Sequence, residues 1–129
     1  GTPLHWAVEN GHVAAIATLV ENGANIAARS NNGGTPLHWA SQNGCVAAIA
    51  TLVEKGADVA AKNDNNATPL HWAAQNGHVA AIAALLDSGA DVVAKTNNNA
   101  TPLHWAAQNG HVQAKDILLK AERQSNHIL

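Results

Sequence analysis

The chain has 129 residues with a formal net charge of -2, and 47% of them are hydrophobic while only 12% are charged. This apolar share is that of a folded domain and argues against disorder, and the small net charge excludes a bulk attraction to nucleic acid or to an acidic membrane surface. No stretch approaches the roughly 20 apolar residues that a membrane span needs. The single cysteine, Cys45, cannot form an internal disulfide, which favours an intracellular, cytoplasmic protein.

One string, T-P-L-H-W-A, recurs at a constant interval of 33 residues, starting at Thr2, Thr35, Thr68 and Thr101. A fixed period of this size is typical of a solenoid of stacked repeats. We expect a single domain over residues 1-129, divided into repeats 1-33, 34-66, 67-99 and 100-129. The string also holds every tryptophan of the chain, which predicts an aromatic core with one Trp per repeat: Trp6, Trp39, Trp72 and Trp105.

The first repeat lacks the polar substitutions expected at an open end of a solenoid. Val13, Ile16 and Leu19 match the internal repeats, and no loop precedes Thr2. Exposed apolar patches of this kind usually mark contacts. We therefore expect either that a preceding repeat or cap has been lost or that this face packs against another molecule, self-association included.

The third repeat illustrates the elements expected in each unit. Thr68 and Pro69 suit the N-cap and the first turn of a short helix, and Gly77 can end that helix in a left-handed conformation. A second helix over residues 79–86 carries apolar residues at helical spacing. A short extended segment and the polar run 95–99 then lead into the next repeat. The unit is thus two antiparallel helices followed by a protruding, hairpin-like loop.

The fourth repeat differs from the others in its second helix. Lys115 takes the place of an isoleucine, and Gln113 and Asp116 take the place of alanines. A terminal repeat needs a polar outer face because no neighbour covers it. We therefore expect a C-terminal capping repeat, followed by a polar tail from about Glu122 to Leu129.

The order T-P-L-H-W-A-A, then G-H, then L-L, then G-A-D-V resembles the ankyrin repeat over essentially the whole chain. The resemblance implies an all-α solenoid of stacked helix-turn-helix pairs with protruding hairpin loops. It further implies a concave face, formed by the loop tips and the first helices, that binds other proteins, and it implies no enzymatic activity. In two departures, Trp replaces the family's usual Leu, and Asn66 and Asn99 replace the turn glycine kept at Gly33.

Histidine is frequent, and two columns of it follow the repeat: His5, His38, His71 and His104, and then His12, His78 and His111 with Cys45 in the remaining place. Equivalent residues of packed helices lie roughly 8–10 Å apart, whereas zinc binds histidine nitrogen at about 2.0–2.1 Å. The first column cannot share a metal, and we expect it to satisfy backbone groups in the first helical turn. There the positive end of the helix dipole should lower the histidine pKa. We predict no catalytic, cofactor or metal site, and Cys45 as a structural residue.

Polar columns are the candidate binding residues. Arg29, Lys62 and Lys95 recur just before each polar loop, and the resemblance places them on the concave face with neighbouring amides. Such a face would suit an acidic or hydrogen-bond-rich protein; the alternative is a solvated column copied by duplication. The candidates are Arg29, Asn31, Asn32, Gln42, Asn43, Lys62, Asp64, Asn65, Gln75, Asn76, Lys95, Asn97, Asn98, Gln108 and Asn109.

The leading hypothesis is therefore a non-catalytic protein-binding module. The alternative is an engineered or idealised scaffold without a natural partner, which the near identity of the third and fourth repeats favours as much as recent duplication does. Irregularities such as Ser41, Cys45 and Val93 favour natural duplication. Nucleic-acid binding would need a basic surface interleaved with aromatic residues, which this sequence does not predict.

Overall fold

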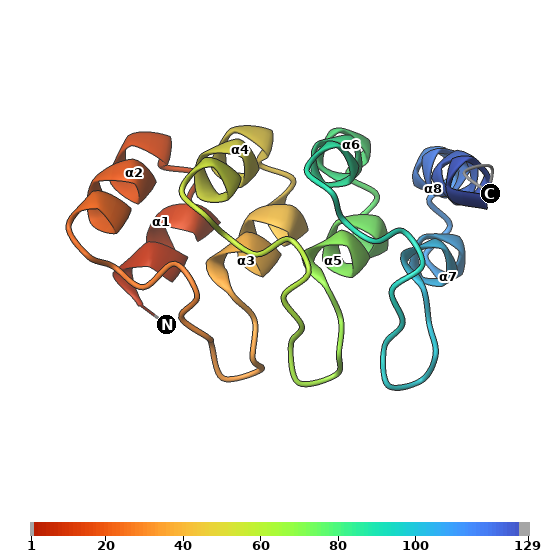
Figure 1. The fold of residues 1–129 in the computed structure, drawn as a ribbon, viewed down its shortest axis with the longest axis horizontal. Helices are drawn as coiled ribbons and strands as arrows, with labels where there is room; N and C mark the ends of the chain where they lie inside the picture. Colours follow the sequence, from red (N-terminus) through yellow and green to blue (C-terminus); the bar gives the residue numbers. More distant parts are fainter. Residues whose placement is uncertain (1, 127–129) are drawn as a thin grey trace.

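The computed structural model describes residues 2–126, and every regular element in that part of the chain is an α-helix. The helices form four successive pairs: α1 (Pro3–Glu9) with α2 (Val13–Glu21), α3 (Pro36–Asn43) with α4 (Val46–Glu54), α5 (Pro69–Gln75) with α6 (Val79–Asp87), and α7 (Pro102–Gln108) with α8 (Val112–Asn126). The first helices form one layer, the second helices form another, and the loops project beyond the first layer (Figure 1). Neighbouring pairs are in contact in both layers. The predicted all-α solenoid of stacked pairs is confirmed.

Each first helix starts with the same reciprocal cap. In α5 the Thr68 hydroxyl accepts a hydrogen bond from the His71 backbone N–H at 3.4 Å, and His71 Nδ1 accepts one from the Thr68 backbone N–H at 3.1 Å. Pro69 fills the first turn, where its missing N–H has no cost. This is a capping box in which histidine stands where Glu or Gln is usual. The same cap forms at α1, α3 and α7.

The second ring nitrogen of these histidines joins one pair to the next. Nε2–H of His38 donates to the Ala67 carbonyl at 2.8 Å, and that of His71 donates to the Ala100 carbonyl at 2.9 Å. His5 makes the same link to the following repeat at 3.2 Å. Because a carbonyl only accepts, Nε2 carries the proton and Nδ1 is the acceptor. The structural role predicted for this column is confirmed and extends beyond its own helix.

The core lies between the two layers of helices. Its largest fully buried side chains recur at the repeat interval: Leu4, Leu37 and Leu70 from the first helices, and Ile16, Ile49 and Ile82 from the second. Each such side chain contributes about 1.5–3 kcal/mol by leaving water. In the last repeat Lys115 stands at the isoleucine position and is exposed. The predicted polar outer face of this repeat is therefore present.

The predicted core of one tryptophan per repeat is wrong for most of the column. Trp6 is 59% exposed, Trp39 and Trp105 are half-buried, and only Trp72, at 8% exposure, is buried. The reason is angular: each Trp follows a core leucine by two positions, which is about 200° around a helix of 3.6 residues per turn. The leucine side chain faces the second helices, so the indoles of Trp39, Trp72 and Trp105 lie on the opposite side, toward the loops. Trp6 instead packs against His12 and lines a cavity with residues of α2.

The loops are tight hairpins that end in a left-handed residue. In the third, the Thr96 N–H donates to the Ala100 carbonyl and the Asn99 N–H donates to the Thr96 carbonyl, both at 2.9 Å. Asn99 has φ 63°, and Asn66 and Gly33 occupy the equivalent place with φ 62° and 83°. This matches a turn closed by a left-handed residue, as in three-residue hairpin loops. The interpretation of Asn66 and Asn99 as substitutes for the turn glycine is confirmed.

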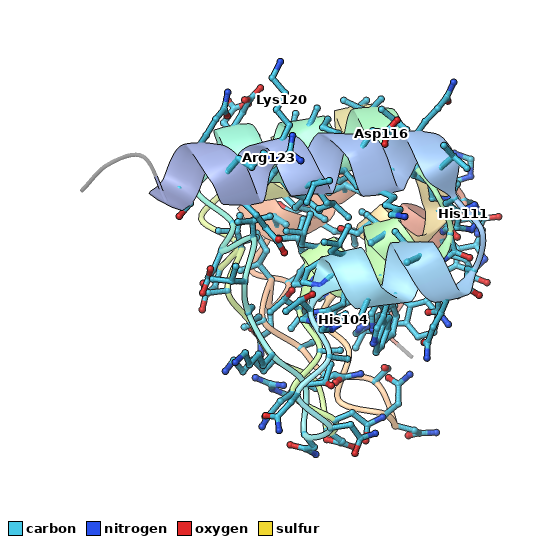
Figure 2. The ribbon with its side chains drawn as sticks, turned by 90° about the vertical axis from the view of Figure 1, so that its right-hand side faces the viewer. His104, His111, Asp116, Lys120 and Arg123 are labelled. Carbon is cyan, nitrogen blue, oxygen red and sulfur yellow. The ribbon has the colours of Figure 1, made fainter. Side chains whose placement is uncertain are left out.

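The last helix is longer than its equivalents. We expected a polar tail from Glu122, but α8 continues through Asn126; the rest of that tail, residues 127–129, lies outside the described residues. Residues 121–124 read A-E-R-Q, all strong helix formers, and Arg123 lies near the negative C-terminal end of the helix dipole. Asp116, Lys120 and Arg123 lie along the outer part of this helix (Figure 2). Residues 122–126 of the expected tail are thus part of a charged helix.

Candidate functional site

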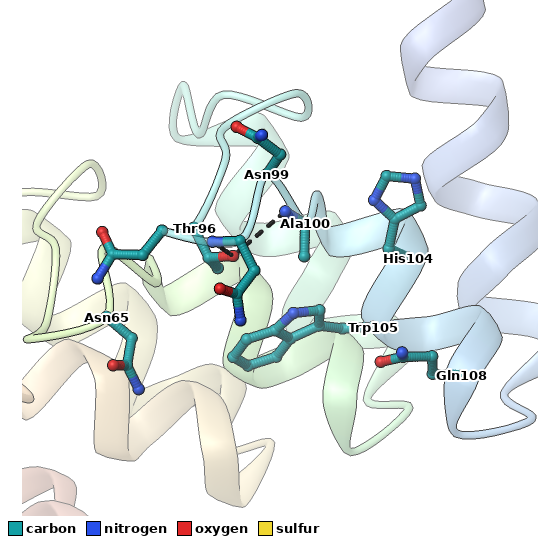
Figure 3. Close-up of a pocket in the computed structure, with 9 residues that line it drawn as sticks. Asn65, Thr96, Asn99, Ala100, His104, Trp105 and Gln108 are labelled. Atoms are coloured by element: carbon teal, nitrogen blue, oxygen red, sulfur yellow. Dashed lines mark hydrogen bonds between the residues drawn. The ribbon is translucent and has the colours of Figure 1, made fainter.

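Two adjoining cavities lie between the hairpin loops and the first helices. One, of about 300 Å³, is lined by Asn32, Trp39, Gln42, Asn63, Asn65, Trp72, Gln75 and Trp105. The other, of about 560 Å³ (Figure 3), is lined by Asn65, Thr96, Asn97, Asn98, Asn99, Ala100, His104, Trp105 and Gln108. They adjoin because Asn65 and Trp105 line both. We call the whole the Trp–amide groove.

The indoles of the groove are held by aromatic contacts between repeats. The Trp72 ring stands perpendicular to that of Trp39, with ring centroids 5.3 Å apart, and packs against His38 at 5.1 Å. Trp105 packs against His71 in the same way at 5.2 Å. Edge-to-face pairs of this kind contribute about 0.5–1.5 kcal/mol beyond burial. The indoles are thereby fixed in orientation before any ligand arrives.

Two buried polar atoms of the groove lack a hydrogen-bond partner among the described residues. They are Nε1 of Trp39, a donor, and Oε1 of Gln42, an acceptor. Buried polar groups in folded proteins are nearly always paired, so an exception calls for a reason. Both side chains line the same part of the groove. Both atoms are enclosed within the wall of the groove and are not open to a ligand.

The loops that wall the groove are joined to one another by backbone hydrogen bonds. The Asp64 N–H donates to the Asn32 carbonyl at 3.2 Å, and one repeat later the Asn97 N–H donates to the Asn65 carbonyl at 3.0 Å. The side-chain amide of Asn66 adds a bond to Asn97 Oδ1 at 2.7 Å. These links hold the three loop tips in register. The wall is therefore one surface and not three separate loops.

The predicted column of cations divides into two kinds. Arg29 donates to the Gly33 carbonyl at 3.0 Å and to the Lys62 carbonyl, so its guanidinium braces the first two loops. Lys62 and Lys95 are exposed. The one ion pair between described residues joins Lys55, just after α4, to Glu21 of α2 at 3.3 Å, away from the loops. Lys62 and Lys95 directly precede the groove residues Asn63 and Thr96 and make no ion pair with a described residue.

The candidate residues of the sequence fall into two sets. Those that line the groove are Asn32, Gln42, Asn65, Gln75, Asn97, Asn98 and Gln108. Those that do not line it are Arg29, Asn31, Asn43, Lys62, Asp64, Asn76, Lys95 and Asn109. The structure thus brings the glutamine column together with the loop asparagines.

The asparagines at the ends of the first helices hydrogen-bond to backbone carbonyls. The Asn76 amide donates to the Trp72 carbonyl at 3.0 Å, and the Asn109 amide donates to the Trp105 carbonyl at 2.7 Å. Asn43 differs, because its amide reaches the Glu9 carbonyl of the preceding repeat at 3.1 Å. Carbonyls at a helix C-terminus lack partners within the helix. The Trp72 and Trp105 carbonyls also accept from the backbone N–H of the same asparagine, so its side chain adds a second bond at the helix end. Neither these asparagines nor Asn43 line the groove.

Sequence reasoning missed the groove tryptophans, together with Asn63, Thr96, Asn99, Ala100 and His104. A signal for the tryptophans was present in their spacing from the core leucines. A helix of seven or eight residues cannot bury two faces that are about 200° apart unless neighbours cover both. The loops cover the second face only in part, which leaves Trp39 and Trp105 half-buried.

The buried histidines beside the groove are neutral at physiological pH. Burial lowers the pKa of His38 from 6.5 to about 4, and the hydrogen bond to Ala67 opposes this only in part. Burial also lowers the pKa of His71, and the nearby Lys62 adds to the effect. The predicted direction is confirmed for these two, but the expected cause is wrong: loss of water, not the helix dipole, is the main one.

The second histidine column likewise joins repeats. His78 Nε2–H donates to the Gln42 carbonyl at 2.8 Å, and His111 donates to the Gln75 carbonyl at 2.9 Å. Cys45 occupies the same place one repeat earlier and is a half-buried free thiol. In the part of the chain that the structure describes, no three His, Cys, Asp or Glu side chains are grouped to hold a metal ion. None of the described helices has the length and apolar character to cross a membrane.

Comparison with known proteins was made at the level of families and of curated sequences. The family model described as "Ankyrin repeats (3 copies)" matches residues 1–63 and again residues 59–127. The two matches together span nearly the whole chain. No curated protein sequence matches it significantly.

Proposed function

Because the chain belongs to the ankyrin repeat family, whose repeats are generally protein–protein interaction modules, we propose that it is a non-catalytic module that binds a partner protein. The partner docks on the concave face formed by the loop tips and the first helices. That face comprises the Trp–amide groove and the lysines at its edge. Residues 1-129 act as one domain of four repeats, within an intracellular compartment suited to the free thiol of Cys45.

The observation that supports this proposal is that the two adjoining cavities of the groove follow the first helices α3, α5 and α7. Large aromatic side chains flanked by polar ones are the composition of binding hot spots. Lys62 and Lys95 lie at the edge without an acidic partner among the described residues, so an acidic protein surface complements them. Nucleic acid is not expected to bind, because the chain as a whole carries a charge of -2.

The test is affinity capture with wild-type protein, the double variant Lys62→Glu/Lys95→Glu, and the control Lys120→Glu on α8. All three positions are exposed, so each variant should fold. We expect a protein retained by wild type and by the control but lost from the double variant. Retention by all three would exclude this part of the concave face.

The alternative, an engineered scaffold without a natural partner, rests on the identity of residues 67–79 with residues 100–112. It predicts no specific capture by any of the three proteins. A partner retained by wild type and lost from the double variant would contradict it.

A further inference from the structure

Building on this proposed function, we propose that the Trp–amide groove binds an extended, proline-rich segment with regularly spaced carboxylates. The segment lies in the polyproline II conformation and runs across the repeats. Its proline rings contact the indoles, its carbonyls accept from side-chain N–H groups, and its carboxylates face Lys62 and Lys95. Four independent features of the groove lead to this occupant.

The first feature is the step between repeats. Packed helices such as α3, α5 and α7 follow one another at roughly 8–10 Å. A polyproline II segment returns to the same face every three residues, which is about 9 Å at 3.1 Å per residue. An extended β-strand presents the same face every two residues, or about every 6.6 Å, which does not match the spacing between repeats. Residues i, i+3 and i+6 of the segment therefore meet equivalent places on successive repeats.

The second feature is the rigid aromatic lining. Proline-rich segments dock in grooves lined by aromatic rings, and they lose little conformational entropy because they are already ordered. The half-buried Trp39 and Trp105 supply such a lining; the buried Trp72 braces Trp39, and His71 braces Trp105. Stacking of a flat sugar ring is less favoured, because Trp72, in the middle of the groove, is only 8% exposed and meets Trp39 edge-on.

The third feature is the hydrogen-bonding capacity of the groove. A polyproline II backbone has no internal hydrogen bonds, so its carbonyls need external donors. The exposed side-chain amides of Gln75 and Gln108 line the groove and provide such donors. Their Oε1 atoms can accept from the N–H of a residue that is not proline.

The fourth feature is the charge on the hairpins. Residues 29–34, 62–67 and 95–100 hold three cations, Arg29, Lys62 and Lys95, and one carboxylate, Asp64. Arg29 is occupied by backbone carbonyls, which leaves the two lysines 33 residues apart at equivalent places on neighbouring loops. A carboxylate at every third position of the segment would meet both in turn.

The probe is the nonapeptide (Pro-Pro-Glu)₃, titrated into the 129-residue chain by calorimetry and by tryptophan fluorescence. The chain has four Trp and no Tyr, so the emission reports on the indoles alone. We expect saturable binding with a shift of the emission to shorter wavelength. The peptides (Gly-Ser-Glu)₃, which lacks the conformation, and (Pro-Pro-Lys)₃, which reverses the charge, should each bind at least tenfold more weakly.

Protein variants locate the site. Lys62→Glu/Lys95→Glu should weaken (Pro-Pro-Glu)₃ binding about tenfold, while Lys120→Glu should leave it unchanged. Trp105→Leu restores the residue usual in the family and should weaken binding at least tenfold, while Trp6→Leu, outside the groove, should not. If Trp105→Leu does not fold by circular dichroism, the exposed Gln108→Ala replaces it, with a smaller loss expected.

Three outcomes would overturn the inference: equal affinity for (Gly-Ser-Glu)₃, no saturable binding of (Pro-Pro-Glu)₃, or saturable binding of cellohexaose alone, which would assign the groove to a glycan. The proposed function is judged separately. In one outcome, the capture experiment yields a partner that depends on Lys62 and Lys95 while the proline peptide does not bind. That result would support protein binding on the concave face and would reject the polyproline II ligand. If both experiments are negative, both proposals fall.

Discussion

His38 uses both of its ring nitrogens, and each use requires the neutral imidazole. Nδ1 accepts from the Thr35 backbone N–H at 3.0 Å, and Nε2–H donates to the Ala67 carbonyl at 2.8 Å. Protonation would turn Nδ1 into a donor facing another donor, in a site with no water contact for the side chain. Loss of water on burial is the main reason why the pKa of His38 falls to about 4, and the nearby Arg29 and His71 add to the effect.

Stability should therefore depend on pH. A lowered folded-state pKa means that the unfolded chain binds the proton more readily, so the stabilisation is complete above about pH 6.5 and is lost as the pH falls toward 4. We expect a loss on the order of 2 kcal/mol between pH 7 and pH 5 from His38, with His71 acting in the same direction. Urea unfolding at pH 7, 6 and 5 measures it.

The control is His38→Gln, because glutamine at this position can still complete a capping box but does not titrate. The variant should be less stable at pH 7 and should lose less stability on acidification. An equal loss in variant and wild type would show that other groups carry the pH dependence.

At the scale of the elements, the start of each second helix depends on a contact with the preceding repeat. The rings of His78 and His111 lie against Gly44 and Gly77, where an added Cβ would come within 2.6 Å and 2.5 Å of Nδ1. Cys45 faces Gly11 in the same way but leaves more room, with 3.7 Å from that Cβ position to Sγ. It also lacks an imidazole to reach the Glu9 carbonyl, the equivalent of the Gln42 carbonyl.

Cys45→His should therefore stabilise the chain. The Glu9 carbonyl accepts from the Asn43 amide and has a second lone pair, so the new imidazole can donate to it as His78 does to the Gln42 carbonyl. One such hydrogen bond contributes about 0.5–1.5 kcal/mol. We expect a gain of about 1 kcal/mol in the free energy of unfolding, measured by urea denaturation. The matched control Cys45→Ala removes the thiol without adding a donor and should bring no gain. A histidine variant no more stable than the alanine variant would contradict the repeat-to-repeat equivalence.

The repeat period was enough to predict the helices, their threonine caps and the left-handed loop residues, because these depend on local sequence. The position of the tryptophans was not predictable in the same way. The tryptophan side of each short helix lies about 200° from its leucine. It becomes core or groove according to how closely the loops approach it, and contacts between repeats determine that approach. The histidine hydrogen bonds to Gly34, Ala67 and Ala100 were not predictable for the same reason, because they also form between repeats.

At the scale of the whole molecule, the N-terminal end has an apolar surface. We expected Ile16 to contribute to it, but Ile16 is fully buried, because it faces the inside of the stack. The surface instead forms a shallow cavity of about 490 Å³ lined by Pro3, Trp6, Ala7, Ala14, Ala15, Thr18 and Leu19. Trp6, at 59% exposure, is its largest accessible apolar side chain.

We predict that copies of the 129-residue chain associate through this surface. Sedimentation velocity should show a weight-average mass that rises with concentration, and Trp6→Lys should return the protein to a monomer without loss of helicity. Trp105→Lys, at the other end of the column, serves as the matched control and should not change the association. A wild-type protein that stays monomeric at high concentration would rule out this contact.

The hydrogen bonds between repeats also determine how firmly the first repeat is attached to the rest of the solenoid. Each later junction has one histidine bond near the loops and one at the turn between the two helices, whereas at the first junction Cys45 stands where the second histidine would be. The His5 bond at this junction is also the longest of its kind, at 3.2 Å. The Asn43 amide on the Glu9 carbonyl and the Lys55–Glu21 ion pair join the same two repeats, so under tension or thermal agitation these two contacts should keep α1 and α2 attached in place of the missing imidazole.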